Sequence, residues 1–395
     1  MENGSEYALT LENNTFEGLN ITNGSYGKFR KRHLTEFPTE LSITLYSIIF
    51  VLSITGNILV ILTIIRDKKM RTITNLFLLN LAASDMMLSV LCMPFSLVAT
   101  TLLRNFIFGE AMCIIIRYFQ AVSVGVSCYT LVAISLERYY AICQPLRSRR
   151  WQTLSHARRM IIGIWIAVLA LMSPIAAFHS VIEIRTGVHA CREIWPDTLV
   201  EYKMELAYNV ALSIFLLLIP LLMMGLFYGL VSKKLWISTN QCNYSPTIEN
   251  PKATTEYTSP RCKSRKDKFG IRTCSVVSKR PSLQPHILTN RKRVIRMLVV
   301  IVLQYFICWT PIYLLTTWNA FDFKSVLRHI SPMAKSLMLL LAYTSSFIHP
   351  ITYGFMNRNF RQGFKSQFQC TSRKSPTTNS FRSNENGRNL VHSTA

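Results

Sequence analysis

The chain has 395 residues, of which 50% are hydrophobic and 16% are charged, and its formal net charge is +24. The apolar residues occur in long blocks, which argues against one or two soluble domains. Four polar segments carry 31 Lys and Arg but only 5 Asp and Glu: 66–74, 147–159, 233–296 and 357–395. A basic excess in loops beside apolar spans marks the cytoplasmic side of a membrane protein, and it argues against nucleic acid as a partner.

Seven apolar stretches are long enough to cross a membrane. Hydrocarbon about 30 Å thick needs roughly 20 apolar residues in a helix. The stretches are 41–65, 75–103, 111–143, 160–182, 204–232, 294–320 and 332–356. They are too long and too continuously apolar for the strands of a barrel. We therefore expect an all-α membrane protein, a seven-transmembrane helix bundle over residues 41–356. It should lie in the plasma membrane as a multi-pass protein with its N-terminus extracellular.

Residues 1–40 precede the first span and are polar, and residues 1–36 lack the apolar core of a signal peptide. Asn-X-Ser/Thr acceptors begin at Asn3, Asn13, Asn20 and Asn23. Such acceptors are glycosylated on surface segments of secreted or extracellular chains. We expect residues 1–40 to form an extracellular tail glycosylated at these asparagines.

Asp85 lies within the second span, where an ionised side chain is costly and is a functional candidate by default. We expect Asn57, Ser127 and Ser346 from other spans to surround it. A carboxylate with several hydroxyl and amide oxygens suits a small hard cation such as sodium, which would be an allosteric ligand. The alternative is a structural polar network without an ion.

Two cysteines lie on the extracellular side of the expected bundle. Cys113 begins the third span and Cys191 lies in the loop 183–203. Because that compartment is oxidising, a disulfide between them is expected, and it would pin the loop across the mouth of the bundle. The alternative is two free thiols.

Glu137, Arg138 and Tyr139 stand together at the cytoplasmic end of the third span. The guanidinium of Arg138 cannot lose its charge, and Glu137 can neutralise it at rest. Release of Arg138, for example toward Tyr228, would make a two-state switch that a ligand can bias. The alternative is a static ion pair.

Span six carries Trp309 two residues before Pro311, with Tyr305 one turn earlier. Proline removes a helical hydrogen bond and kinks a helix, so Trp309 could change its packing when a ligand presses from above. The alternative is a bundle that does not move. Span seven has a similar pattern, with His349 directly before Pro350.

The segment 237–290 is rich in Ser, Thr, Lys and Arg, and we expect it to be a disordered third cytoplasmic loop. Residues 357–370 place Phe360, Phe364 and Phe368 on one face beside basic residues. This spacing predicts an amphipathic eighth helix along the membrane surface.

Cys370 ends the expected eighth helix and is a palmitoylation candidate, the alternative being an unmodified thiol. We expect residues 371–395 to form a polar cytoplasmic tail.

The order and spacing of these residues resemble the rhodopsin-like (class A) G-protein-coupled receptors over about 41–370. The matching positions are Asn57, Asp85, Cys113, Glu137-Arg138-Tyr139, Trp165, Cys191, Pro220, Tyr228, Cys308-Trp309-Thr310-Pro311 and Pro350-Ile351-Thr352-Tyr353. Within that family the chain is most similar to the cholecystokinin/gastrin and sulfakinin receptors. The strings that carry this are Val132–Tyr139, Trp151–Ala157, Lys292–Leu298, Ala342–Ser346 and Phe355–Arg361.

The resemblance implies a peptide agonist outside and a heterotrimeric G protein inside, often of the Gq class with calcium release. It also implies that Tyr353 takes part in the switch, and that arrestin and receptor kinases are partners. Arg192 matches the position at which cholecystokinin receptors contact a sulfated tyrosine. Thr316 and Asn319 stand where those receptors have Asn and Arg, so the ligand end is altered.

Further candidates for ligand binding surround Arg192. Arg117 and Lys335 add positive charge at the mouth, which would suit sulfate or carboxylate, the alternative being ordinary exposed loop charge. An aromatic and polar pocket below them would hold a peptide, although each member alone could be packing. Its expected members are Tyr118, Phe119, Gln120, Tyr313 and Tyr343.

Three residues depart from the family pattern and narrow the choice of ligand. Gln120 provides no carboxylate that could bind an amine ligand, and Tyr343 stands where a retinal-binding receptor needs a lysine. His349 replaces the usual Asn or Asp, which puts sodium binding in doubt. A transporter or channel would need repeats or a chain of ionisable groups, which we do not find. No metal-ligand spacing, phosphate loop or nucleophile elbow supports an enzyme or a cofactor. A receptor for another peptide or a small ligand remains the alternative within the class.

Overall fold

The computed structural model describes residues 38–103, 105–198, 203–243 and 285–369, and the structural statements below concern these residues. The four sequons, most of the third cytoplasmic loop and Cys370 with the tail after it lie outside the described residues. The predictions made for them are therefore not addressed by the structure.

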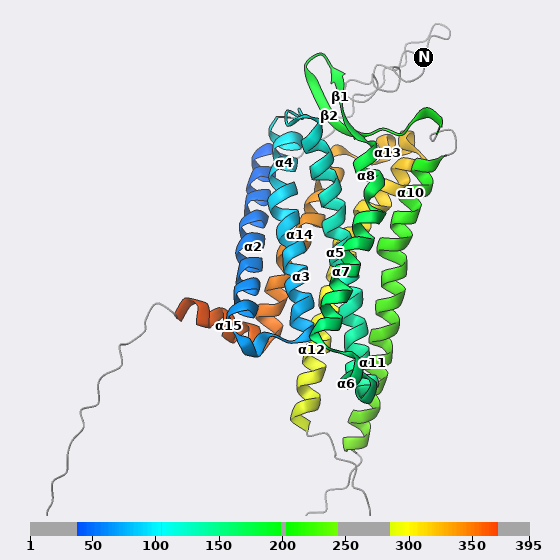
Figure 1. Ribbon diagram of the computed structural model, residues 1–395. Coiled ribbons are helices and arrows are strands. Elements are labelled where there is room, and N and C mark those ends of the chain that lie inside the picture. The colour runs from blue at the N-terminus through cyan, green and yellow to red at the C-terminus, as the bar shows by residue number, and fades with distance from the viewer. Residues whose placement is uncertain (1–37, 104, 199–202, 244–284, 370–395) are drawn as a thin grey trace, which may run out of the picture.

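Seven long helical segments form a bundle in the described chain (Figure 1). They are α2 (Thr39–Arg66), α3 (Ile73–Met87) with its continuation to Leu97, α5 (Gly109–Cys143), α7 (Leu154–Leu171) with its continuation to Phe178, α10 (Met204–Ser213) with α11 (Ile219–Asn243), α12 (Pro285–Phe321) and α14 (Pro332–Met356). Six of these segments are long and apolar enough to cross a membrane. The seventh, α14, has 25 residues, enough to span. It buries polar residues such as Ser346 and His349 against the bundle.

Two helices contain π-helical turns shortly before a proline. The turn η2 (Leu88–Cys92) precedes Pro94 in α4 (Met93–Leu97), and η4 (Ile214–Leu218) precedes Pro220. A proline ring clashes with the carbonyl four residues earlier and offers no N–H, so a wider turn there relieves the clash. A further π turn, η3 (Val98–Leu102), ends the α3–α4 rod.

A β-hairpin lies at one end of the bundle, and α15 lies at the other end (Figure 1). After α8 (Ser173–Phe178), β1 (His179–Arg185) pairs antiparallel with β2 (Val188–Glu193), with Val181 opposite Cys191. Gly187 takes a φ of 79° in the connecting turn, a value that favours glycine. The expected end of span four at 182 is therefore wrong, because the helix ends at Phe178 and β1 follows it. The apolar run continues into β1, which hid the boundary.

Short helices complete the loops: η1 (Lys68–Met70), α6 (Pro145–Trp151) and α13 (Phe323–His329). The expected loop 237–290 is too wide, because α11 runs to Asn243 and α12 begins at Pro285. Helices that leave the membrane no longer need apolar residues, so hydropathy does not mark their ends.

The eighth helix is present as α15 (Arg358–Gln369), which leaves the bundle at a steep angle to its axis (Figure 1). Phe360 is fully buried, and its ring centroid lies 5.5 Å from that of Tyr353 on α14. Arg66 at the end of α2 donates to the Oε1 atom of Gln367 at 2.6 Å. These contacts attach the amphipathic helix to the first and last helices of the bundle.

Candidate functional site

The C-terminal end of α5, which was expected to be cytoplasmic, holds a closed ion pair. Arg138 Nε lies 2.6 Å from Glu137 Oε2, and Arg138 Nη2 lies 2.8 Å from Glu137 Oε1. Thr74 on α3 donates to Glu137 Oε2 at 3.0 Å and also contacts the guanidinium. Glu137 and Thr74 are 8% and 7% exposed. The pair therefore sits in a shielded position between two helices, where charge-assisted bonds are strong.

The tyrosines expected in the switch do not join this pair. The Tyr139 hydroxyl accepts from Gln144 Nε2 at 3.0 Å, and its ring packs on Phe227. Tyr228 and Tyr353 are buried, and neither hydroxyl makes a well-formed hydrogen bond among the described residues. Tyr228 lies within electrostatic reach of Arg138 and interacts with Ser135, whereas Tyr353 lies within electrostatic reach of Asp85. In the resting arrangement Tyr228 is therefore a nearby alternative partner for the arginine.

Asp85 and His349 form the central buried pair of the bundle. Asp85 is 3% exposed and His349 is 1% exposed, and His349 Nδ1 lies 2.8 Å from Asp85 Oδ2. Ser127 on α5 also interacts with the carboxylate, and its hydroxyl bonds that of Ser84 at 2.9 Å. The pairing satisfies a carboxylate that would otherwise be buried alone.

The other expected partners of Asp85 lie one step away from it. Asn57 Nδ2 donates to the backbone carbonyl of Ser346 at 2.9 Å, and it makes no hydrogen bond to Asp85. This contact depends on a close approach of α2 to α14, since a Cβ at Gly56 would lie 2.9 Å from Pro350 Cβ. Ser346 reaches the network through Ser89, whose hydroxyl donates to the Asp85 backbone carbonyl. Contrary to the expectation, Asn57 and Ser346 therefore reach Asp85 through other residues and not by bonds to its carboxylate.

The residues around Asp85 do not fit a sodium site. A hard cation takes oxygen ligands at short distances. Here an imidazole nitrogen, which is not an oxygen ligand, covers one carboxylate oxygen, and His349 Nε2 is buried without a partner. An ion would have to displace His349. The expectation of sodium came from Asp85 and the hydroxyls, and the histidine opposes it.

A column of rings rises from the core toward the mouth along α12. The ring centroids of Tyr305 and Trp309 lie 6.4 Å apart, as do those of Trp309 and Tyr313. Trp309 Nε1 donates to Ser345 Oγ on α14 at 3.1 Å. Pro311 lies inside the helix between these rings. Movement of the upper ring would therefore reach Trp309 and, through Ser345, α14.

The disulfide between Cys113 and Cys191 is present and joins β2 to the start of α5. Arg192 follows Cys191, and Arg117 lies one helical turn after Cys113, so the bridge brings both cations to one region. Arg192 also interacts electrostatically with Lys335 on α14. The structure thus gathers the three mouth cations that the sequence predicted.

Burial and the charge of Arg117 both act on the pKa values of two hairpin residues, His179 and Glu193. Burial and then the charge of Arg117 lower the pKa of His179 to about 4, so this histidine is neutral at physiological pH. Burial raises the pKa of Glu193, whose Oε1 accepts from Trp195 Nε1 at 2.7 Å. Glu193 also lies within electrostatic reach of Arg117, beside the cations at the mouth.

The pocket residues separate into two groups. Gln120 has a buried Oε1 atom with no partner, and Tyr343 is fully buried with its hydroxyl donating to Ser96 at 2.9 Å. Tyr118 instead donates to the Leu169 carbonyl on α7 and packs there, which argues against its role in the pocket.

Two more of the expected ligand contacts lie higher on α12. Thr316 is exposed and donates to the Tyr313 carbonyl of its own helix, and Asn319 is half-buried one turn further. Phe119 stacks edge-on with Tyr118.

Sequence reasoning missed Thr74, which holds both members of the ion pair, and Ser345, which holds Trp309. Both are buried polar residues on apolar helices, and that feature alone marks them as candidates. Their positions on adjacent helices, however, follow only from packing.

The bundle, the tethered hairpin and the locked arginine together define a seven-helix membrane receptor. The sequence matches the family described as 7 transmembrane receptor (rhodopsin family) over residues 56–353, and the chain belongs to that family. This confirms the fold class and the resemblance inferred from the motifs, and it makes the chain a receptor rather than an enzyme.

Three relatives show which members it resembles. Cholecystokinin receptor type A of Cavia porcellus is 41% identical over 86% of this chain and 83% of its own length. Cholecystokinin receptor type A of Homo sapiens is 39% identical over 93% and 87%. Gastrin/cholecystokinin type B receptor of Rattus norvegicus is 36% identical over 83% and 78%. The similarity covers most of each chain.

Proposed function

We propose that the chain is a plasma-membrane receptor for an extracellular peptide of the cholecystokinin and sulfakinin kind. Its N-terminus lies outside and it activates a heterotrimeric G protein, of the Gq class, inside. The observation that carries the proposal is the similarity to cholecystokinin receptors over most of the chain. The closed pair at Arg138 and the cationic mouth support it from the structure.

The residues at the mouth of the bundle predict where the acidic group of the peptide binds. Arg117, Arg192 and Lys335 offer charge-assisted bonds to a sulfate or carboxylate, and Gln120 offers an acceptor to a peptide N–H or terminal amide. Thr316 and Asn319 do not add a cation on α12. We therefore expect the acidic group of the peptide to bind beside the hairpin rather than against α12.

Inside, release of Arg138 from Glu137 would free its donors for the G protein or for Tyr228, which already lies within electrostatic reach of Arg138. Arrestin and receptor kinases are proposed as further cytoplasmic partners. Glycosylation at the four sequons and palmitoylation at Cys370 stay predictions.

The test is a peptide panel on cells that express the chain. Amidated peptides that end like cholecystokinin or sulfakinin are applied with and without a sulfated tyrosine, and calcium and cyclic nucleotides are recorded. We expect a calcium response that a Gq inhibitor removes. Silence across the panel would contradict the ligand assignment, whereas a cyclic-nucleotide response without calcium would contradict only the Gq class.

Arg192→Gln is expected to reduce the potency of a sulfated agonist about tenfold, because one charge-assisted bond contributes roughly 1.5–3 kcal/mol. The potency of the unsulfated peptide should change much less. Arg328→Gln is a matched control, since it removes an exposed cation on α13 and leaves the hairpin unchanged. Equal losses for both peptides would point to a structural role of Arg192 and against sulfate recognition.

Thr74→Val is expected to raise signalling without agonist by up to about tenfold, because it keeps the side-chain volume and removes a hydrogen bond to Glu137. The readout is basal nucleotide exchange normalised to surface expression. Thr44→Val on α2 is a suitable control, since that hydroxyl bonds only the Glu40 carbonyl of its own helix. Unchanged basal exchange would remove Thr74 from the lock.

A further inference from the structure

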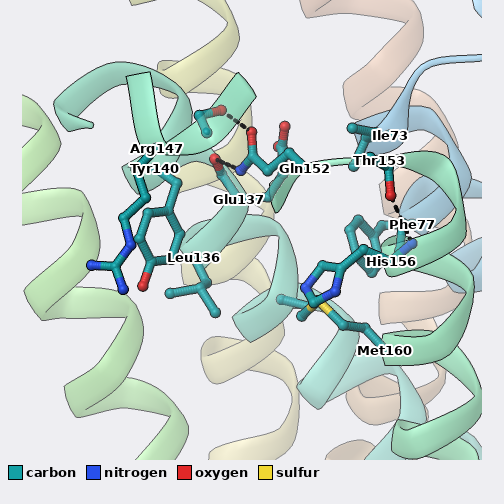
Figure 2. A pocket seen from close by; sticks show the side chains of 13 residues that line it. Ile73, Phe77, Leu136, Glu137, Tyr140, Arg147, Gln152, Thr153, His156 and Met160 are labelled. Atoms are coloured by element: carbon teal, nitrogen blue, oxygen red, sulfur yellow. Dashed lines mark hydrogen bonds between the residues drawn. The ribbon is translucent and has the colours of Figure 1, made fainter. Parts of the chain in front are cut away.

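A cavity of about 320 Å³ lies among the cytoplasmic ends of α3, α5 and α7, beside α6. Figure 2 shows Leu136 on one side and Phe77, His156 and Met160 on the other, with Glu137 and Gln152 between them. The walls are mainly apolar. Its volume is at the lower end of the range of about 300–1,000 Å³ for small-molecule sites, so it suits a slender ligand rather than a peptide.

One Arg or Lys side chain lines this cavity, that of Arg147. Arg147 is exposed on α6, with its guanidinium carbon 5.9 Å from the centre of the Tyr140 ring, and His156 faces the cavity from α7. The one carboxylate in the lining, that of Glu137, is bonded to Arg138 and Thr74. An apolar interior with a guanidinium at its edge is complementary to a molecule with an apolar body and an anionic head.

We propose that this cavity binds a single-chain anionic amphiphile, such as a fatty acid released into the inner leaflet, with its carboxylate at Arg147. The site lies on the basic face that the loops present to anionic lipid, which raises the local concentration of such molecules. A two-chain phospholipid would exceed the volume of the cavity.

Occupation of the cavity acts on the switch. Gln152 Nε2 donates to the Glu137 backbone carbonyl at 2.8 Å, and Ser148 on α6 bonds to Gln152. The cavity thus exists in the conformation in which Glu137 holds Arg138. A ligand that prefers this conformation stabilises it, so the amphiphile lowers agonist-driven G-protein activation. This consequence rests on the proposed function, whereas the binding itself does not.

Binding is measured on the purified full chain in phosphatidylcholine nanodiscs. The probe is dodecanoate with a photoreactive group at the chain end, competed by unlabelled dodecanoate, dodecanol or dodecylamine, with cross-linked peptides mapped by mass spectrometry. We expect labels on the segments that line the cavity, and competition by dodecanoate at lower concentrations than by either of the other two. Labels confined to the lipid-facing surfaces of other helices would overturn the proposal.

Two variants make the test specific. Arg147→Gln should weaken dodecanoate binding about tenfold with little change for dodecanol. Arg149→Gln on the same helix is the matched control, because Arg149 is exposed and does not line the cavity. Ala157→Leu, which adds volume to the lining, should weaken both ligands. A melting transition close to that of wild type confirms that each variant folds.

The binding of the amphiphile and its effect on G-protein activation can be contradicted independently of each other. Unchanged dodecanoate affinity in both Arg147→Gln and Ala157→Leu would overturn the site even if a G protein responds to agonist. Loss of labelling in both variants supports the site even if no G protein responds. In cells that do respond, dodecanoate should reduce the agonist signal of wild type and not that of Arg147→Gln, each normalised to its own maximum.

Discussion

Arg138→Ala is expected to reduce agonist-driven nucleotide exchange by at least about tenfold, within the range typical of coupling between two sites. In the locked state the guanidinium makes its bonds to Glu137 and Thr74. In the active state those donors are the groups that a G protein or Tyr228 would meet. Alanine removes the hydrogen bonds of both states, so the receptor can leave the resting state but has no guanidinium donor for the G protein.

The assay is nucleotide exchange on a purified G protein, with peptide binding measured in parallel to show that the variant folds. Arg138→Lys is the informative companion, because it keeps the charge and loses the planar fork of donors. We expect it to fall between wild type and alanine. If Arg138→Ala coupled as well as wild type, the ion pair would be a static contact, and the switch would have to lie elsewhere in the bundle.

Thr74→Val and Arg138→Ala should move signalling in opposite directions, although both break bonds in the same cluster. Valine weakens the hold on Arg138 and keeps its donors, so basal exchange rises. Alanine removes the donors themselves, so the maximal response falls. A structural defect would instead lower both signals, and the pair of variants therefore separates a switch from a stabilising contact.

Much of this architecture follows from the sequence because lipid imposes strong rules. Spans must be long, apolar and helical, which locates the bundle, and a charge inside it must find a partner, which singles out Asp85 and Arg138. The disulfide and the gathering of Arg117 with Arg192 follow from a topology in which both cysteines lie at the same end of the bundle. These predictions hold because they depend on one helix or one compartment at a time.

Predictions that depend on how helices are rotated against each other fared less well. Asn57 shares the core with Asp85, yet it bonds the Ser346 carbonyl because Gly56 draws α2 onto α14. Tyr118 lies one residue from Arg117 and still faces α7. Thr74 and Gln152 acquire their roles only where α3, α5 and α6 meet. Hydropathy carries no information on such rotations, nor on the point at which an apolar helix becomes the strand β1.

His349→Asn is expected to create a dependence of agonist affinity on sodium that the wild type lacks. In the wild type, His349 Nδ1 covers Asp85 Oδ2, and no oxygen replaces it toward an ion. The shorter asparagine side chain offers an amide oxygen and uncovers the carboxylate, which together with the Ser127 hydroxyl makes the oxygen set that a hard cation requires. Sodium bound there would favour the resting bundle and weaken agonist binding by roughly fivefold or more.

The measurement is agonist affinity in sodium against an organic cation at equal ionic strength, so that screening by salt is constant. Wild type should give the same affinity in both, and the double variant Asp85→Asn with His349→Asn should again be insensitive, because the carboxylate is gone. Removal of the histidine also leaves a buried carboxylate with fewer partners, an arrangement that costs stability. The thermal stability of His349→Asn should therefore fall without sodium and recover when sodium is added. If the agonist affinity of the wild-type receptor already depends strongly on sodium, the ion displaces His349. In that case His349 and sodium compete for the Asp85 carboxylate.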